Sequence, residues 1–578
     1  MPRAEPVGAI PVGGYRDVPY SDGLTAPLTA EDRKRRASVQ SNDDHYTLDR
    51  GMVFEGRACH DAFFAVLYLL VLVAAFGTAS ASLTNADYTL EPPAELGCPE
   101  LDASRDTGAL HALLRRATPG VQSFDSFLES FKRKVPWVLP AVVGGAVAIG
   151  FVYLQLLRCF ARPMVYISLG FFPAGFTAAG VAIISLPEDA VGGWDKQGRL
   201  TTMYILFALA AVYLLVLCCL RKRIEMTIRT LTTAGEALAQ TAAVFLTCFG
   251  VFLVWLVLAT ATGTGMVVAL FNGEWSAVEN AEGNVESCVY ALDVTGSSTL
   301  AVCAFTFLWT SLLFTELRGF VVAGTIGHWY YHSTDASPPL KYPSLTACSL
   351  AFGKSFGSMC LGSLILAIIQ VILFIIRAAR EANRDSDNVG VKIVLCLLEC
   401  CIQCIYEIVR IFTSFVTIVT SISGQSFVQS AKTVSAVCRR NGFEIVVVDS
   451  LASAVLSMGA FIFSLALATI PWIALVIIEP LDEEPLSDSY YAYTGGLCGA
   501  AFLVGMIVLG SFSGIVLNAA STLFICFVVD RDVQTHGTAY GNGEQQIVLA
   551  THVQVVHATF LETHPPKLDE SQLIDSRQ

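Results

Sequence analysis

Several aromatic side chains stand inside long apolar segments, where ring faces can bind a cation. They are Tyr166, Trp255, Phe305, Phe307 and Trp309. A quaternary ammonium ion has no proton to donate, so ring faces rather than hydrogen bonds hold it. A desolvated cation–π contact contributes about 2 kcal/mol, so two or three rings offset part of the cost of dehydration. The alternative for each ring is packing against lipid or core. The rings are therefore candidates for a cation site.

Two polar side chains among apolar neighbours are a second candidate feature. Gln370 stands within LILAIIQVILFII, and Glu316 follows LLFT. Polar groups inside a membrane are costly, so they often mark transport paths. For Gln370, a place on such a path and a hydrogen bond between helices both remain open. For Glu316, the simpler interpretation is a carboxylate that reaches water at the membrane surface.

The sequence gives little support for a metal site or for enzymatic activity. Cys396, Cys400 and Cys404 recur at helical spacing, but no histidine stands nearby and the segment is apolar. Ordinary packing is the simpler interpretation for such cysteines. The sequence also has no Walker loop and no His-Glu-X-X-His motif. We predict no metal site, no cofactor and no enzymatic activity.

The composition indicates a membrane protein. Of 578 residues, 54% are hydrophobic and only 15% are charged, whereas soluble domains carry about 25% charged residues. A spanning helix needs about 20 apolar residues. We count ten such segments, at 61–82, 135–157, 163–187, 200–220, 242–265, 293–315, 355–376, 396–423, 447–478 and 496–528. The predicted fold is all-α, a polytopic membrane protein with about ten transmembrane helices.

Charge sets the predicted orientation. An even number of spans places both termini on one side, and a cytosolic placement puts more Lys and Arg on cytosolic than on outer segments. FKRK at 131–134 opposes this assignment. The net charge is −13 and no basic patch is concentrated enough to hold a phosphate backbone, so we expect no nucleic-acid partner.

Three regions follow from these patterns. Residues 1–60 are polar and are predicted to form a disordered cytosolic tail, 61–528 the transmembrane domain, and 529–578 a cytosolic C-terminal tail. Within the domain, 83–134 is the longest outer loop. Apolar residues recur at helical spacing among basic ones in 221–241, which predicts an amphipathic helix along the cytosolic leaflet.

Two cysteines stand apart from the apolar segments. Cys98 lies in the predicted outer loop 83–134, and Cys288 lies in the predicted outer loop 266–292. Single cysteines in two outer loops suggest a disulfide that joins the loops. The alternative is two free thiols.

The segment RGFVVAGTIGHWYYHS at 318–333 combines small residues with aromatic ones. Gly319, Gly324 and Gly327 lie on or beside one face of a predicted helix, which allows close packing. The rings of 329–331 fall where this helix leaves the membrane, so we predict that they anchor it at the interface.

Seven segments together resemble the choline transporter-like family of eukaryotic ten-span proteins, in its fungal and protist branch. They are ARPMVY (161–166), RKRI (221–224), FLWT (307–310), VVAGTIGHWYY (321–331), FGSMCLGSLILAIIQ (356–370), SAKTVSAVCRRNGFEIVVVD (430–449) and STLFICFVVDRD (521–532). The resemblance implies a carrier of choline, with ethanolamine as a second substrate, in the plasma membrane or an organelle membrane.

On this resemblance we expect alternating access around an aromatic pocket in the lipid bilayer. Trp309, Phe305 and Trp255 are the expected cation-binding rings, and Gln370 and Tyr166 are secondary candidates along the path. A non-transporting scaffold or signalling protein and a cation channel are the alternatives. The sequence leaves the oligomeric state open.

Overall fold

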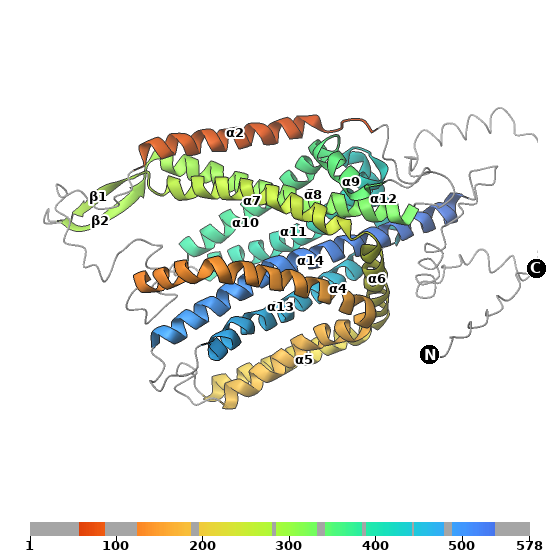
Figure 1. Ribbon diagram of the computed structural model, residues 1–578, viewed down its shortest axis with the longest axis horizontal. Coiled ribbons are helices and arrows are strands. Elements are labelled where there is room, and N and C mark those ends of the chain that lie inside the picture. Colours follow the sequence, from red (N-terminus) through yellow and green to blue (C-terminus); the bar gives the residue numbers. More distant parts are fainter. Residues whose placement is uncertain are drawn as a thin grey trace, which may run out of the picture. The chain divides into compact units, whose positions relative to one another are not determined.

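The protein is described from a computed structural model. The structure describes residues 57–86, 124–185, 196–279, 285–331, 341–383, 389–441, 444–478 and 488–537. Figure 1 shows that long helices make up nearly all of these residues. The predicted all-α class of a polytopic membrane protein is therefore confirmed. The predicted tails 1–60 and 529–578 fall largely outside the described residues and stay predictions.

The elements follow one another along the chain in a simple order. They are α2 (Ala62–Asn85), α4 (Phe124–Ser185), α5 (Lys196–Cys219), α6 (Arg221–Gln240), α7 (Ala243–Ala269), β1 (Gly273–Glu279), β2 (Val285–Leu292), α8 (Val294–Tyr331), α9 (Pro343–Phe352), α10 (Phe356–Ala382), α11 (Val389–Ser423), α12 (Phe427–Asn441), α13 (Glu444–Ile478) and α14 (Asp488–Gly537). The two strands pair antiparallel, with Gly273 opposite Leu292. The predicted outer loop 266–292 therefore contains a β-hairpin.

The described part of the chain holds eight helices long and apolar enough to cross a membrane. One of these stretches, 142–185, has 44 residues, about twice the length that one crossing needs. Phe160 interrupts it with non-helical backbone (φ −131°, ψ 32°), and Figure 1 shows the sharp bend of α4. This count takes 142–185 as one helix, although its two halves could each cross a membrane, and it leaves out α11. The number of ten spans therefore remains a prediction.

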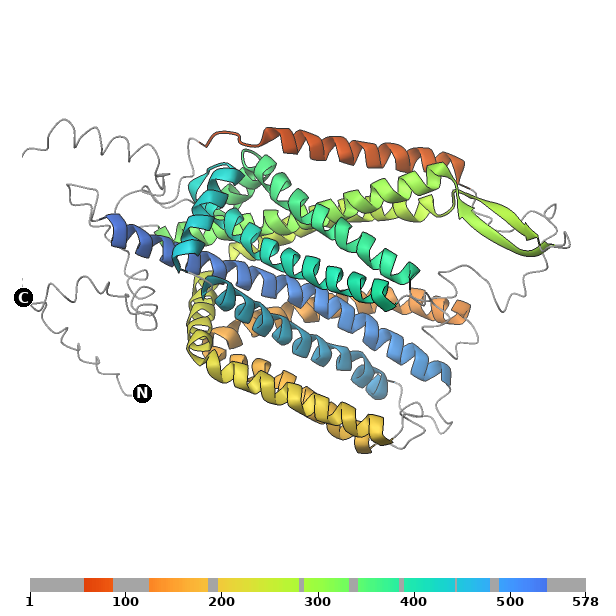
Figure 2. The same ribbon diagram turned by 180° about the vertical axis from the view of Figure 1, so that it is seen from behind.

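Short helices gather at one end of the long ones. Figures 1 and 2 show α6, α9 and α12 at this end, and the β-hairpin at the other. Helix α2 begins at the same end, and α14 ends there. We call it the α6 end. By the distribution of basic residues it is the predicted cytosolic end.

Helix α6 confirms the predicted helix at 221–241 but not its placement. Its apolar side chains, among them Leu231, Ala234 and Leu238, are buried against protein. A Cβ added to Gly235 would lie 3.7 Å from the Cα of Arg158 on α4. Helix α6 packs on α4 beside its bend, and on α13 and α14, so its apolar face lies against these helices rather than the leaflet.

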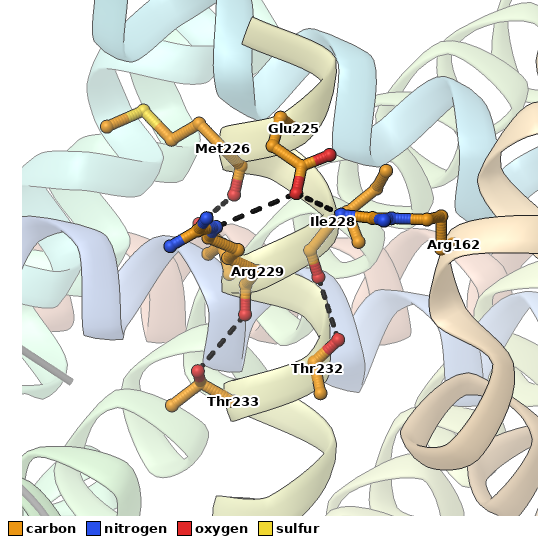
Figure 3. Close-up of polar contacts among 8 residues, drawn as sticks. Arg162, Glu225, Met226, Ile228, Arg229, Thr232 and Thr233 are labelled. Carbon is orange, nitrogen blue, oxygen red and sulfur yellow. Dashed lines mark hydrogen bonds and ion pairs between the residues drawn. The ribbon is translucent and has the colours of Figure 1, made fainter. Parts of the chain in front are cut away.

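The outer face of α6 carries a small charge cluster, drawn in Figure 3. The guanidinium of Arg162 on α4 lies 2.5 Å from Glu225 Oε1, and Arg229 Nε lies 3.7 Å from the same oxygen. The side chain of Arg162 is 65% exposed, so water screens this interaction.

We therefore expect Glu225→Gln to lower the free energy of unfolding by less than about 1 kcal/mol. Thermal unfolding of the purified variant in detergent checks this. A loss of several degrees in Tm would mean that the cluster fixes α4 against α6 more strongly than an exposed ion pair does.

Helix α8 packs on α2, α7, α9, α10, α11 and α14, and its second half is almost fully buried. Close packing through small residues is seen at Gly324, where an added Cβ would lie 2.7 Å from the Cβ of Ala347 on α9. The predicted interface anchor is wrong for Tyr330, which is buried and packs on Tyr331. Trp329 Nε1 donates a hydrogen bond to Gln240 at the end of α6. Tyr330 therefore packs on protein, whereas anchoring by Trp329 and Tyr331, which are half-buried, stays a prediction.

Gly324→Val is expected to destabilise the protein by about 1–3 kcal/mol, because the new side chain must push α9 away from α8. The measurement is thermal unfolding in detergent. Gly250→Ala on α7 is the matched control, because no atom outside its own helix lies within 4 Å of that added Cβ. Equal melting temperatures for both variants would contradict the close contact.

Candidate functional site

Trp309 is the centre of the candidate site. It lies midway along α8 with only 1% of its surface exposed. Its indole Nε1 donates a hydrogen bond to the Ser363 hydroxyl of α10 at 3.1 Å, and the carbonyl of Cys360 lies 3.4 Å away. A buried indole N–H needs such a partner. The bond to Ser363 therefore fixes the orientation of the ring between α8 and α10.

Helix α2 contributes a ring that the sequence did not indicate. Tyr68 packs edge-on against Trp309, with ring centroids 5.3 Å apart. Its hydroxyl lies 3.1 Å from the hydroxyl of Thr310, and its ring also meets Phe356 at 6.0 Å. Tyr68 is thus held by both its ring and its polar tip.

One signal in the sequence could have revealed this residue. The buried residues of α2 are Tyr68, Ala75 and Ser82, while most of the helix faces outward. These three recur every seven residues, which places them on one side of a helix. In a segment rich in leucine and valine, that spacing of small and polar residues indicates the face that packs on protein.

The structure brings two of the three predicted main rings together. Phe305 lies one turn before Trp309 on α8, with ring centroids 5.8 Å apart. Trp255 lies on α7 and donates from Nε1 to the Ser311 hydroxyl at 3.3 Å. Within the described residues no ring contact joins Trp255 to Trp309. We call Tyr68, Phe305 and Trp309 the aromatic cluster.

The secondary candidates lie farther from this cluster. Gln370 is half-buried on α10, seven residues after Ser363. It therefore lies on the same side of α10, about 10 Å farther along the helix. Tyr166 lies on α4, 48% exposed, and the structure does not bring it to the cluster.

A buried carboxylate lies two turns along α8 from Trp309. Glu316 is 6% exposed and accepts a hydrogen bond from the Thr417 hydroxyl of α11. The interpretation that this carboxylate reaches water is wrong, since protein surrounds it. Residues seven apart share one side of a helix, so Glu316 lies below the cluster toward the α6 end.

The structure does not describe both cysteines of the predicted disulfide. Cys98 lies outside the described residues. Cys288 pairs with Ala277 in the hairpin, but its side chain also lies outside them, so the disulfide stays a prediction. Within the described residues, no group of three or more His, Cys, Asp or Glu side chains lies close enough to hold a metal ion.

Comparison with known proteins identifies the family. Residues 204–532, more than half of the chain, match the family of plasma-membrane choline transporters. The chain belongs to the choline transporter-like family. This match confirms the resemblance found in the sequence, and it makes the chain a multi-pass membrane protein of a transporter family.

Individual members of the choline transporter-like family are distant. A CTL-like protein of Dictyostelium discoideum is 25% identical, over 84% of this chain and 87% of the relative. Choline transporter-like protein 1 of Caenorhabditis elegans is 24% identical over 59% of this chain. The fungal Protein PNS1 of Mycosarcoma maydis is 26% identical over 67%. The match to the nematode protein covers only 47% of that relative, and the match to the fungal one covers 68%.

The family match covers part of the candidate site. Trp255, Phe305, Trp309 and Gln370 lie within residues 204–532. Tyr68 precedes this region. The aromatic cluster thus combines a segment that matches the choline transporter-like family with a helix outside the matched region.

Proposed function

We propose that this choline transporter-like protein carries choline, or a closely related small organic cation such as ethanolamine, across a membrane by alternating access. The observation that carries the proposal is the aromatic cluster. Three rings from α2 and α8 meet inside apolar helices, midway along α8 and two turns from the start of α2, next to α10. Ring faces are the groups that bind a quaternary ammonium ion.

The burial of Trp309 supports alternating access over a permanently open pore. With 1% of its surface exposed, the ring is covered by protein on all sides. A cation therefore reaches it only when α2 or α10 moves away from α8. Such separation of packed helices around a central site is the usual motion of carriers built from membrane helices.

A carrier of a fixed positive charge needs no coupled ion to concentrate its cargo. A potential of 100 mV contributes about 2.3 kcal/mol per charge, which corresponds to about 50-fold accumulation at equilibrium.

The test is uptake of labelled choline into proteoliposomes that contain the purified protein, with an inside-negative potential switched on and off. We expect saturable uptake that the potential increases and that excess unlabelled choline abolishes. Folded, reconstituted protein without uptake of choline or ethanolamine would contradict the proposal. Protein-free liposomes are the control for leakage.

A further inference from the structure

The residues just before α2 are ordered, although the sequence predicted them as part of a disordered tail. Arg57 is buried, and its Nη2 donates to the carbonyl oxygen of Ser421, near the end of α11. Its guanidinium also lies 6.0 Å from the ring centroid of Phe320 on α8. Carbonyls at a helix C-terminus carry partial negative charge, which favours a cation there. Burial lowers the pKa of Arg57 to about 10, so the side chain stays charged at neutral pH.

Asp61 places a negative charge at the start of the next helix, whereas Arg57 places a positive charge at the end of α11. One carboxylate oxygen, Oδ2, accepts a hydrogen bond from the Ser358 hydroxyl of α10 at 2.7 Å and from the backbone N–H of Phe427 at 3.0 Å. Phe427 is the first residue of α12. Asp61 therefore caps α12 from a distant part of the chain, where the N–H groups and the partial positive charge of a helix start favour a carboxylate.

The backbone around the 57–61 segment is shaped to receive it. Asp61 adopts φ 56°, the only positive φ of a non-glycine residue in the described part of the chain. Gly424, which follows α11, has φ 70°, and an added Cβ there would lie 3.0 Å from the Arg57 side chain. A Cβ on Gly357 would overlap the carbonyl oxygen of Asp61. The positive φ of Asp61 is strained, and Gly357 and Gly424 leave space that a side chain would fill. Together they indicate that the 57–61 segment binds here in one specific conformation.

This docked segment lies on the approach to the aromatic cluster from the α6 end. Tyr68 follows Asp61 by seven residues, about 10 Å along α2. Cys360 lies one turn beyond Gly357 on α10, is fully buried, and its carbonyl faces the indole of Trp309. The segment thus joins α2 to α10, α11 and α12 directly beside the two helices that hold Trp309.

We propose that the 57–61 segment is a latch that closes the α6 end over the aromatic cluster. When Asp61 leaves Ser358 and Phe427, the start of α2 separates from α10 and the Trp309 region opens toward that end. The role of this opening in transport rests on the proposed function, but the motion itself does not.

Two variants release the latch by different routes. Asp61→Ala removes the acceptor of both hydrogen bonds and disfavours the positive φ. Gly357→Ala displaces the segment sterically and leaves its side chains intact. Asp61→Asn is the matched control, because its single amide oxygen accepts both hydrogen bonds and Asn tolerates this conformation. Gly250→Ala controls for adding a methyl group to a helix.

The readout is the rate at which N-ethylmaleimide alkylates Cys360, resolved from the other cysteines by peptide mass spectrometry of the full-length protein in proteoliposomes. We expect about tenfold faster labelling in Asp61→Ala and in Gly357→Ala, and wild-type rates in both controls. The buried Cys248 of α7 is the internal reference and stays unchanged.

Two results would overturn the latch. Cys360 labelling at the wild-type rate in both release variants would mean that the segment does not control access. Equal acceleration at Cys248 would mean that the segment holds the whole fold together instead. The labelling uses no cargo, so an absence of choline uptake would refute the proposed function and leave this result standing. Choline uptake together with unchanged Cys360 labelling would refute the latch and support the proposed function.

Discussion

Trp309→Ala is expected to raise the half-saturating choline concentration at least tenfold. The substitution removes the ring that Tyr68 and Phe305 surround, and a desolvated cation–π contact contributes about 2 kcal/mol, or about 30-fold in affinity. Labelled uptake in proteoliposomes over a range of choline concentrations gives the constant.

Removing a buried indole also costs stability, by about 3–5 kcal/mol, so Trp309→Phe separates the two effects. Phenylalanine keeps a ring face for the cation but loses the hydrogen bond to Ser363, which is worth about 1 kcal/mol. We expect a smaller rise in the half-saturating concentration and a smaller loss in Tm. Phe307→Ala changes an exposed ring on the same helix and serves as the control. A folded Trp309→Ala protein with wild-type affinity would show that the cargo binds elsewhere.

Glu316→Gln is expected to reduce choline uptake about tenfold while the protein remains as stable as wild type. Glutamine keeps the shape of the side chain and an oxygen that accepts from Thr417, so the packing between α8 and α11 survives. The negative charge is lost. At about 10 Å from the cluster and an effective dielectric constant of about 20, an isolated carboxylate attracts a cation by about 1.7 kcal/mol, which is an upper bound because the positive charges of Arg318 and Arg410 act on the same carboxylate.

The two measurements for Glu316→Gln are uptake at low choline concentration and thermal unfolding. Glu225→Gln is the matched control, since it removes a carboxylate from the exposed face of α6. Unchanged uptake by Glu316→Gln would show that the carboxylate serves only as a hydrogen-bond acceptor between α8 and α11. A large fall in Tm would mean that its charge holds the helices together.

Hydropathy predicted the spanning segments because each one must bury about 20 apolar residues in lipid, whatever its partners are. It also placed Trp309, Phe305 and Trp255 inside such segments. It predicted a helix for 221–241, but amphipathicity only shows that one face is covered. It does not show whether a leaflet or the side chains of α4, α13 and α14 cover that face.

The rest depends on contacts between distant parts of the chain. Thr417, the partner of Glu316, lies 101 residues away in sequence, and Phe427 lies 366 residues from Asp61. Nothing in the local sequence of 57–61 indicates either helix end that it contacts. For Tyr68 the sequence holds one signal, its seven-residue spacing from Ala75 and Ser82. That spacing indicates only which face of α2 packs on protein, and the contacts with Thr310 and Trp309 come from distant parts of the chain.

The packing of α8 on both earlier and later helices has a consequence for biogenesis. Helix α8 packs on α2 and α7, which are synthesised before it, and on α10, α11 and α14, which are synthesised after it. At 5–20 residues per second, the roughly 200 residues between the ends of α8 and α14 take about 10–40 s to make. During that time the buried side of α8, with Glu316 among its residues, has no α14 to cover it. Another membrane component must therefore cover this side of α8 until α14 is made. We expect substitutions on the α8-facing side of α14 to reduce the yield of inserted protein more than they reduce the stability of the folded protein.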